Sequence, residues 1–184
     1  MVATDRLNQT SNILHKSMKR TSSIAHLTAL DHPFKIAVIG SGNWGTTIAK
    51  VVSENAALNP QLFASEVRMW VFEEKINGKN LTEIINTDHE NVKYLPNIKL
   101  PVNLIATPDL LETVKGADII IFNIPHQFLT RIVQQLKGHV DSHVRAISCL
   151  KGFEVGAKGV QLLSTYITDE LNIECGALSG ANIA

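Results

Sequence analysis

The sequence has few of the features that disulfide-rich, nucleic-acid-binding and membrane proteins require. Two cysteines among 184 residues are too few for a disulfide framework, and neither stands in a CxxC pair that would bind zinc. Seventeen Lys and Arg residues balance seventeen Asp and Glu residues, which disfavours constitutive nucleic-acid binding through neutralised phosphates. The longest apolar runs, such as residues 119–122, are too short to span a membrane. These absences favour a reduced, soluble, intracellular protein without a structural metal.

The residues that are present indicate one folded domain with an extension. Hydrophobic residues make up 45% of the chain, and its 184 residues fit one α/β domain of about 150 residues plus a short appendage. The first part of the chain is rich in Ser and Thr, has no regular apolar period and carries a basic patch at Lys16, Lys19 and Arg20. Such a segment buries too little surface to offset its ordering entropy. We therefore expect a mobile tail at residues 1–33 and one domain at residues 34–184.

From residue 34 onward, apolar runs typical of buried strands alternate with helical stripes. Strands are predicted at residues 34–39, 67–72, near 103–106, 118–124, 144–150 and 174–178. Helices are predicted at residues 43–55, 80–86, 127–137 and 158–171, with Val51 and Phe128 on apolar helix faces. Strands that alternate with helices run parallel and are joined by right-handed crossovers. The predicted fold class is α/β, with a Rossmann-type doubly wound, mostly parallel sheet.

A glycine-rich motif, GSGNWG, joins the first strand to the first helix. It consists of Gly40, Ser41, Gly42, Asn43, Trp44 and Gly45, and it matches GxGxxG in the required strand–turn–helix context. Gly40 permits the tight turn, Gly42 lets the backbone approach a pyrophosphate, and Gly45 lets helix and strand pack closely. The helix N-terminus then offers N–H groups and a positive dipole end to the phosphates. The motif predicts a dinucleotide-binding site.

Two carboxylates, Glu73 and Glu74, close the second strand, where an acidic residue binds the adenosine ribose in this kind of fold. Carboxylates there repel a 2′-phosphate, so they favour NAD over NADP and predict a preference for NADH over NADPH. A solvated strand end is the alternative interpretation for either residue.

Three further segments follow strand ends and should border the ligand crevice, because ligands bind outside the carboxyl ends of such strands. The segments are residues 123–128, 148–152 and 179–184. Lys151 emerges there and would meet a carbonyl or a phosphate, although a solvent-facing lysine is the alternative. His126 follows a proline at a helix start and is interpreted as a structural or capping residue. Cys149 and Cys175 are interpreted as inert core thiols.

Seven segments in order resemble the eukaryotic NAD-dependent glycerol-3-phosphate dehydrogenases, and the fungal cytosolic enzymes most closely. They are VIGSGNWGTTIAK, MWVFEEKINGKNLTEIINT, ENVKYLP, FNIPHQF, GHV, ISCLKG and GANIA, between about residues 33 and 184. The resemblance implies an oxidoreductase of glycerol and carbohydrate metabolism. Such an enzyme interconverts dihydroxyacetone phosphate plus NADH and sn-glycerol 3-phosphate plus NAD.

The resemblance also implies roles for particular residues. Gly40 to Gly45 would hold the pyrophosphate of NAD, and Phe72 and Phe128 would flank the dinucleotide. Ala184 would contact the cofactor near its nicotinamide end. Lys151 would touch both cofactor and substrate, and stabilise charge that develops on the substrate oxygen.

The family continues beyond GANIA with a helical domain that supplies the proton-donating lysine, the arginine that binds the substrate phosphate, and much of a homodimer contact. This sequence ends at Ala184, so it resembles the cofactor-binding half, as a fragment that is expected to be inactive alone. Two alternatives stay open. One is a non-catalytic NAD(H)-binding module, and the other is a related two-domain dehydrogenase acting on a hydroxyacid or on 6-phosphogluconate.

The tail carries two further expectations. Ser22 and Ser23 follow Arg20 in a basic, Ser-rich stretch that suits a protein kinase, so we predict phosphorylation there, with an unmodified tail as the alternative. Residues 6–14 resemble the peroxisomal nonapeptide signal of the fungal enzymes, but Ile13 stands where histidine or glutamine is wanted. Cytoplasmic residence is therefore expected.

Overall fold

The computed structural model describes residues 32–156 and 159–178. The chain divides after Pro33, and the fold described below lies in the unit that begins at Phe34. The expectations for the tail at residues 1–33 therefore fall almost entirely outside the described residues. Phosphorylation at Ser22 or Ser23, the targeting stretch and the contact of Ala184 with a cofactor also lie outside them.

The centre of this unit is a six-stranded sheet in which every neighbouring pair of strands is parallel. Its strands are β1 (Phe34–Ile39), β2 (Phe63–Trp70), β5 (Leu104–Thr107), β6 (Ile119–Phe122), β7 (Arg145–Ser148) and β10 (Glu174–Ala177). Their order is β10-β7-β6-β1-β2-β5. From β1 the chain adds β2 and β5 on one side of the sheet. It then crosses back and adds β6, β7 and β10 on the other side of β1. The predicted doubly wound Rossmann-type fold is confirmed, with its switch point between β1 and β6.

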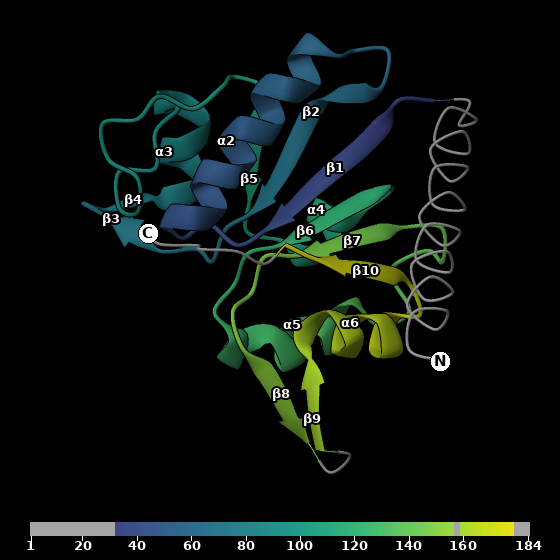
Figure 1. The fold of residues 1–184 in the computed structure, drawn as a ribbon. Coiled ribbons are helices and arrows are strands. Elements are labelled where there is room, and N and C mark those ends of the chain that lie inside the picture. Colours follow the sequence, from purple (N-terminus) through teal and green to yellow (C-terminus); the bar gives the residue numbers. More distant parts are fainter. Residues whose placement is uncertain (1–31, 157–158, 179–184) are drawn as a thin grey trace, which may run out of the picture. The chain divides into compact units, whose positions relative to one another are not determined.

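Helices cover both faces of the sheet (Figure 1). They are α2 (Asn43–Leu58), α3 (Leu81–Asp88), α4 (Leu110–Val114), α5 (Leu129–Leu136) and α6 (Leu163–Leu171), and the 3₁₀ turn η1 (His126–Phe128) precedes α5. In Figure 1, α2 and α3 lie on one side of the sheet and α5 and α6 on the other. Among the described residues, no helix is both long enough and apolar enough to cross a membrane.

Strand β1 shows why the sheet needs cover on both faces. Ala37 and Ile39 belong to the core formed with α4, α5 and α6, whereas Ile36 and Val38 belong to the core formed with α2 and α3. Successive side chains of a strand point to opposite faces, so a continuous apolar run feeds both cores at once. The apolar runs in the sequence therefore located the central strands well.

Some strand and helix boundaries differ from the predicted ones, because they depend on pairing between distant strands or on local turns. Strand β2 begins at Phe63 rather than at residue 67, because Phe63 pairs with Phe34 of β1. Helix α2 continues to Leu58 through residues with good helix propensity. Two residues predicted on apolar helix faces are exposed, Val51 at 46% and Phe128 at 48%.

Two hairpins and one helix were absent from the sequence-based prediction. The hairpins are β3 (Lys75–Ile76) with β4 (Lys79–Asn80), and β8 (Phe153–Gly156) with β9 (Gly159–Leu162). The helix is α4, where the sequence predicted no element. The helix predicted at residues 158–171 is wrong in its first part, because residues 159–162 form β9 and α6 begins at Leu163. Gly159 has φ +97°, a conformation that an α-helix cannot contain.

Candidate functional site

The glycine-rich turn between β1 and α2 is closed on one side by the chain itself. Gly40 has φ +115°, and a Cβ there would lie 2.4 Å from the carbonyl oxygen of Asn123, which follows β6. A Cβ on Gly45 would lie 2.3 Å from the carbonyl oxygen of Gly40. These two positions must be glycine because the backbones of the turn, the helix and β6 touch there. The geometry fits the roles expected for both residues.

Gly42 differs from the other two glycines of the motif. Its φ is −63°, which any residue adopts, and a Cβ there would meet nothing within 4 Å. The packing of the chain therefore gives no reason for glycine at this position. A ligand that approaches the backbone closely would give one.

Helix α2 begins directly at this turn and presents an uncompensated N-terminus. Gly42 is its N-cap, no side chain caps it, and its first turn contains no acidic residue. The N–H groups of the first turn and the dipole of a 16-residue helix therefore favour an anion at the open side of Gly42.

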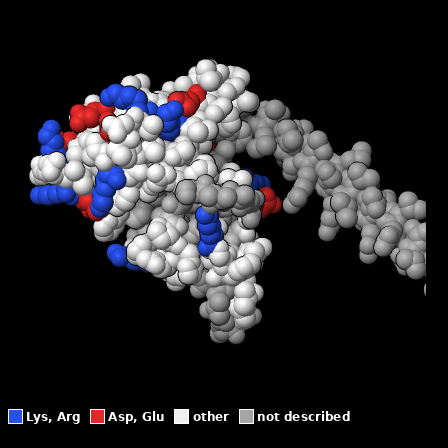
Figure 2. Space-filling view, turned by 60° about the vertical axis from the view of Figure 1, so that its left-hand side comes forward, with Lys and Arg blue, Asp and Glu red and all other residues white. Residues whose placement is uncertain are grey.

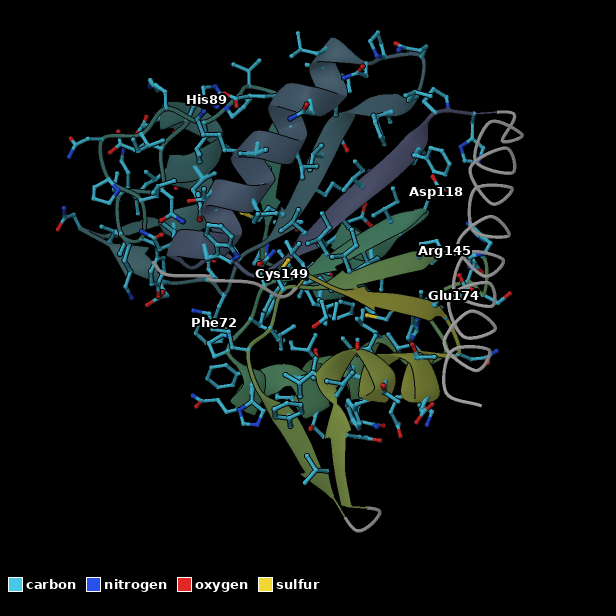
Figure 3. All side chains as sticks on the ribbon, in the orientation of Figure 1. Phe72, His89, Asp118, Arg145, Cys149 and Glu174 are labelled. Carbon is cyan, nitrogen blue, oxygen red and sulfur yellow. The ribbon has the colours of Figure 1, made fainter. Side chains whose placement is uncertain are left out.

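Three exposed aromatic side chains belong to segments that leave the carboxyl ends of the strands. Phe72 follows β2 and is 65% exposed, Phe128 lies in η1 after β6, and Trp44 lies in the first turn of α2 with 38% of its surface exposed. Figure 3 places Phe72 at the same edge of the sheet as Cys149, which follows β7. Exposed rings at the edge of the sheet where the glycine turn begins are suited to flank the planar groups of a nucleotide.

The predicted site segments after β6 and β7 reach the same edge of the sheet as the glycine turn, because all these strands are parallel. Lys151 is the third residue after β7 and is exposed. His126, interpreted as a structural or capping residue, is exposed in η1 and is the N-cap of neither η1 nor α5, so the capping alternative is wrong.

Neither cysteine lies in surroundings that favour its thiolate. Cys149 is buried just after β7, and burial raises the pKa of its thiol. Burial also raises the pKa of Cys175, in β10, to about 12. A thiol rather than a thiolate is a weak nucleophile, so neither residue has the character of a catalytic cysteine.

Asn123 follows β6 beneath the glycine turn, in a segment expected to border the ligand crevice, but the sequence predicted no role for its side chain. Both polar atoms of its carboxamide are buried, and its side chain interacts with the thiol of Cys149. No local pattern in the sequence distinguishes this asparagine from any other strand-end residue.

The carboxylates that close β2 are engaged by the chain. Glu73 accepts hydrogen bonds from the backbone N–H and the hydroxyl of Thr82, at the start of α3. Glu74 forms an ion pair with Lys93 and accepts a 2.6 Å hydrogen bond from the hydroxyl of Tyr94. The bond from Lys93 holds the pKa of Glu74 below its ordinary value. Both carboxylates therefore already have partners within the protein, so they are neither simply solvated nor without a partner until a ribose binds. The preference for NADH over NADPH stays a prediction.

Charge is mixed around the site. Figure 2 shows Lys, Arg, Asp and Glu side chains next to one another on the upper part of the molecule, the side of α2 and α3, and few charged side chains on the lower part. Within the described ranges, no group of three or more His, Cys, Asp and Glu residues is placed to hold a metal ion. The site offers a local anion-binding turn rather than an extended field of one sign.

A separate hollow of about 230 Å³ lies at the opposite, amino-terminal ends of β1 and β2. It is lined by Lys35, Ile36, Ala64, Glu66, Arg68, Thr113, Lys115 and Ala117. None of the residues predicted to bind a cofactor or a substrate lines it. The site is therefore assigned to the carboxyl edge from the turn geometry and not from cavity size.

Comparison with known proteins gives a consistent result over most of the chain. Residues 35–184 match the model of the family described as NAD-dependent glycerol-3-phosphate dehydrogenase N-terminus. A glycerol-3-phosphate dehydrogenase [NAD(+)] 1 of Candida glabrata is 72% identical over 190 residues, covering 99% of this chain and 48% of that protein. The protein of the same name from Saccharomyces cerevisiae is also 72% identical, over 99% of this chain and 46% of its own length.

A solved structure agrees with these sequence matches. The glycerol-3-phosphate dehydrogenase of Saccharomyces cerevisiae superposes with a TM-score of 0.79 and 77% identity, over 82% of this chain and 43% of that one. The chain thus spans about half the length of the curated relatives it matches.

Proposed function

The chain belongs to the NAD-dependent glycerol-3-phosphate dehydrogenase family, and we propose that it forms the cofactor-binding part of such an enzyme. The proposed reaction interconverts dihydroxyacetone phosphate plus NADH and sn-glycerol 3-phosphate plus NAD. The observation that carries the proposal is the contrast at the turn. At Gly40 and Gly45 backbone atoms occupy the space that a side chain would need, whereas the space beside Gly42 is empty. Gly42 also begins a helix whose first turn has no acidic residue.

The residues at the carboxyl edge fit a dinucleotide. Backbone N–H groups from Gly42 onward would bind the pyrophosphate, and Phe72 and Phe128 would flank the nucleotide with their exposed rings. Ala184, assigned to the nicotinamide end by resemblance, lies outside the described residues. Bound NADH supplies the hydride of the reaction, and the protein positions and polarises the reacting groups.

Lys151 is proposed to act on the substrate carbonyl. It emerges at the carboxyl end of β7, the edge to which the glycine turn also belongs. Reduction of a carbonyl makes its oxygen an alkoxide, and a nearby ammonium stabilises that charge more in the transition state than in the ground state. The proton that neutralises the alkoxide is expected from the part of the enzyme that follows in the relatives.

The remaining assignments rest on the resemblance and on composition. We propose that the complete enzyme is a homodimer. We propose cytoplasmic residence, because residue 13 of the tail departs from the peroxisomal pattern. We also propose that the chain consists of a mobile tail at residues 1–33 and a cofactor-binding domain at residues 34–184. The balanced charge of the chain supports small-molecule partners rather than nucleic acid.

A chimera tests the proposal. This chain replaces the matching half of the Candida glabrata relative, and the purified chimera is assayed for NADH oxidation with dihydroxyacetone phosphate. We expect turnover by the chimera, and NADH binding without turnover by the 184-residue chain alone. A folded chimera that binds NADH and fails to turn over would favour a non-catalytic NAD(H)-binding module. Failure of the folded chain to bind NADH would reject the cofactor assignment itself.

A further inference from the structure

One fully buried polar residue lies outside the predicted site yet contacts its centre. Asn91 lies between α3 and β5, fifty positions from Ser41 in the sequence, and is 0% exposed. Its Nδ2 donates hydrogen bonds to the carbonyl oxygen of Ser41 at 2.9 Å and to Oγ1 of Thr46 at 2.8 Å. The Thr46 hydroxyl in turn donates to the same Ser41 carbonyl at 2.9 Å. Two buried donors therefore converge on one carbonyl oxygen of the glycine-rich turn.

The orientation of the Asn91 carboxamide is set from its other end. Its Oδ1 accepts a hydrogen bond from the backbone N–H of Tyr94 at 3.1 Å, and the N–H of Leu95 donates to the Asn91 carbonyl at 2.9 Å. All the polar groups of this side chain are thus engaged, which makes a buried amide stable rather than costly. The carboxamide cannot rotate without breaking bonds at both ends.

The same segment connects two loops of the candidate site. The Tyr94 carbonyl accepts a 3.1 Å hydrogen bond from Nδ2 of Asn43, in the first turn of α2. The Tyr94 hydroxyl donates to Glu74, which follows β2. Residues 91–95 therefore hold the glycine turn and the end of β2 in one arrangement, although no residue of the segment belongs to either loop.

The bond to Ser41 has a consequence for the neighbouring N–H. Ser41 C=O and Gly42 N–H belong to one peptide group, and the peptide bonds of the described residues are all trans. In a trans peptide these two groups point in opposite directions. Holding the Ser41 carbonyl toward Asn91 and Thr46 therefore turns the Gly42 N–H away from these buried side chains.

We propose that Asn91 is a positioning residue for the diphosphate of a dinucleotide. It holds the Ser41–Gly42 peptide with the Gly42 N–H directed at the bound phosphate oxygens. This role rests on the proposed function, because it requires a dinucleotide at the turn. It assigns a binding function to a residue that touches no ligand.

The test compares Asn91→Ala with Asn86→Ala, which changes an exposed asparagine of α3. Asn86 also uses both ends of its carboxamide on backbone, donating to the Ala106 carbonyl and accepting from the Ala106 N–H at 2.8 Å each, but it anchors β5 rather than the turn. NADH affinity of the 184-residue chain is measured by fluorescence titration at a temperature where each variant is folded. We expect Asn91→Ala to weaken NADH binding about tenfold, since the turn loses an ordering hydrogen bond. Asn86→Ala should bind within about twofold of wild type even if it lowers Tm.

A second variant and a second measurement keep the proposal testable if Asn91→Ala does not fold. Thr46→Val preserves side-chain volume and removes the other donor to the Ser41 carbonyl, so it should weaken NADH binding in the same direction. In ¹H–¹⁵N spectra, both variants should shift the Gly42 amide resonance, and Asn86→Ala should not. Wild-type affinity in both variants overturns the role of Asn91. Absence of NADH binding by the folded wild-type chain overturns the proposed function instead.

Discussion

The two edges of the central sheet use polar groups in opposite ways. At the amino-terminal edge, polar side chains pair with one another: Arg145 with Glu174 at 3.2 Å and His143 with Asp118 at 3.4 Å. At the carboxyl edge, the glycine turn leaves an open backbone position and a helix N-terminus without an acidic residue. Figure 3 shows Asp118, Arg145 and Glu174 at the first edge and Phe72 and Cys149 at the second.

This difference indicates which edge is built for a ligand. Asp118 is only 4% exposed, and its carboxylate accepts a 2.8 Å hydrogen bond from the backbone N–H of Lys35, so it ties β6 to the start of β1. Charges that are satisfied within the fold serve structure. Open N–H groups and uncovered aromatic rings gain partners only when something binds.

The largest effect is expected from a substitution at the open glycine. Gly42→Val should abolish NADH binding, because the side chain fills the space where a pyrophosphate approaches the backbone. The fold should persist, since nothing lies within 4 Å of the added Cβ. Circular dichroism and an NADH fluorescence titration measure the two properties separately. Unchanged NADH affinity would remove the turn from the site.

A large effect on rate is expected from the cation at the end of β7. In the chimera with the Candida glabrata relative, Lys151→Ala should lower kcat by about 10²–10³, as the loss of one transition-state donor does elsewhere. NADH affinity should fall much less, and Lys151→Arg should restore only part of the rate, because a planar guanidinium differs from a compact ammonium. If kcat of the alanine variant stays within a few-fold of wild type, Lys151 is a surface lysine and the proposed role is wrong.

Stability rather than binding should change at the closed glycine. In Gly45→Ala the new Cβ would lie 2.3 Å from the Gly40 carbonyl oxygen, so the turn or the helix must shift. Overpacking of this kind costs about 1–3 kcal/mol in the free energy of unfolding, measurable by urea denaturation. Gly42→Ala is the matched control and should unfold at the wild-type urea concentration. Equal stability of the two variants would contradict the geometry of the turn.

The smallest effect is expected at the opposite edge. The side chains of Arg145 and Glu174 are 54% and 78% exposed, and such surface pairs contribute less than about 1 kcal/mol. Arg145→Ala should therefore change urea stability slightly and leave NADH affinity at the wild-type value. A clear loss of NADH binding in this variant would mean that the two edges are not independent.

The sequence alone determined the central strands and the glycine turn, because both follow from local chemistry. A run such as residues 119–122 is apolar throughout because a parallel strand is covered on both faces, and GxGxxG between a strand and a helix has few other uses. The same local rules misplaced Val51 and Phe128, since periodicity states which residues share a helix face but not which neighbour covers that face.

Only the tertiary structure decided how the turn is held. Asn91 reaches Ser41 across fifty positions of sequence, and Glu73 and Glu74 find Thr82, Lys93 and Tyr94 through the path of the intervening loop. No periodicity connects such positions, because a side-chain hydrogen bond depends on where two backbones pass in space. The residues that offer N–H groups to a ligand were therefore readable from local sequence. The role proposed for Asn91 in orienting the Gly42 N–H could be inferred only from the folded structure.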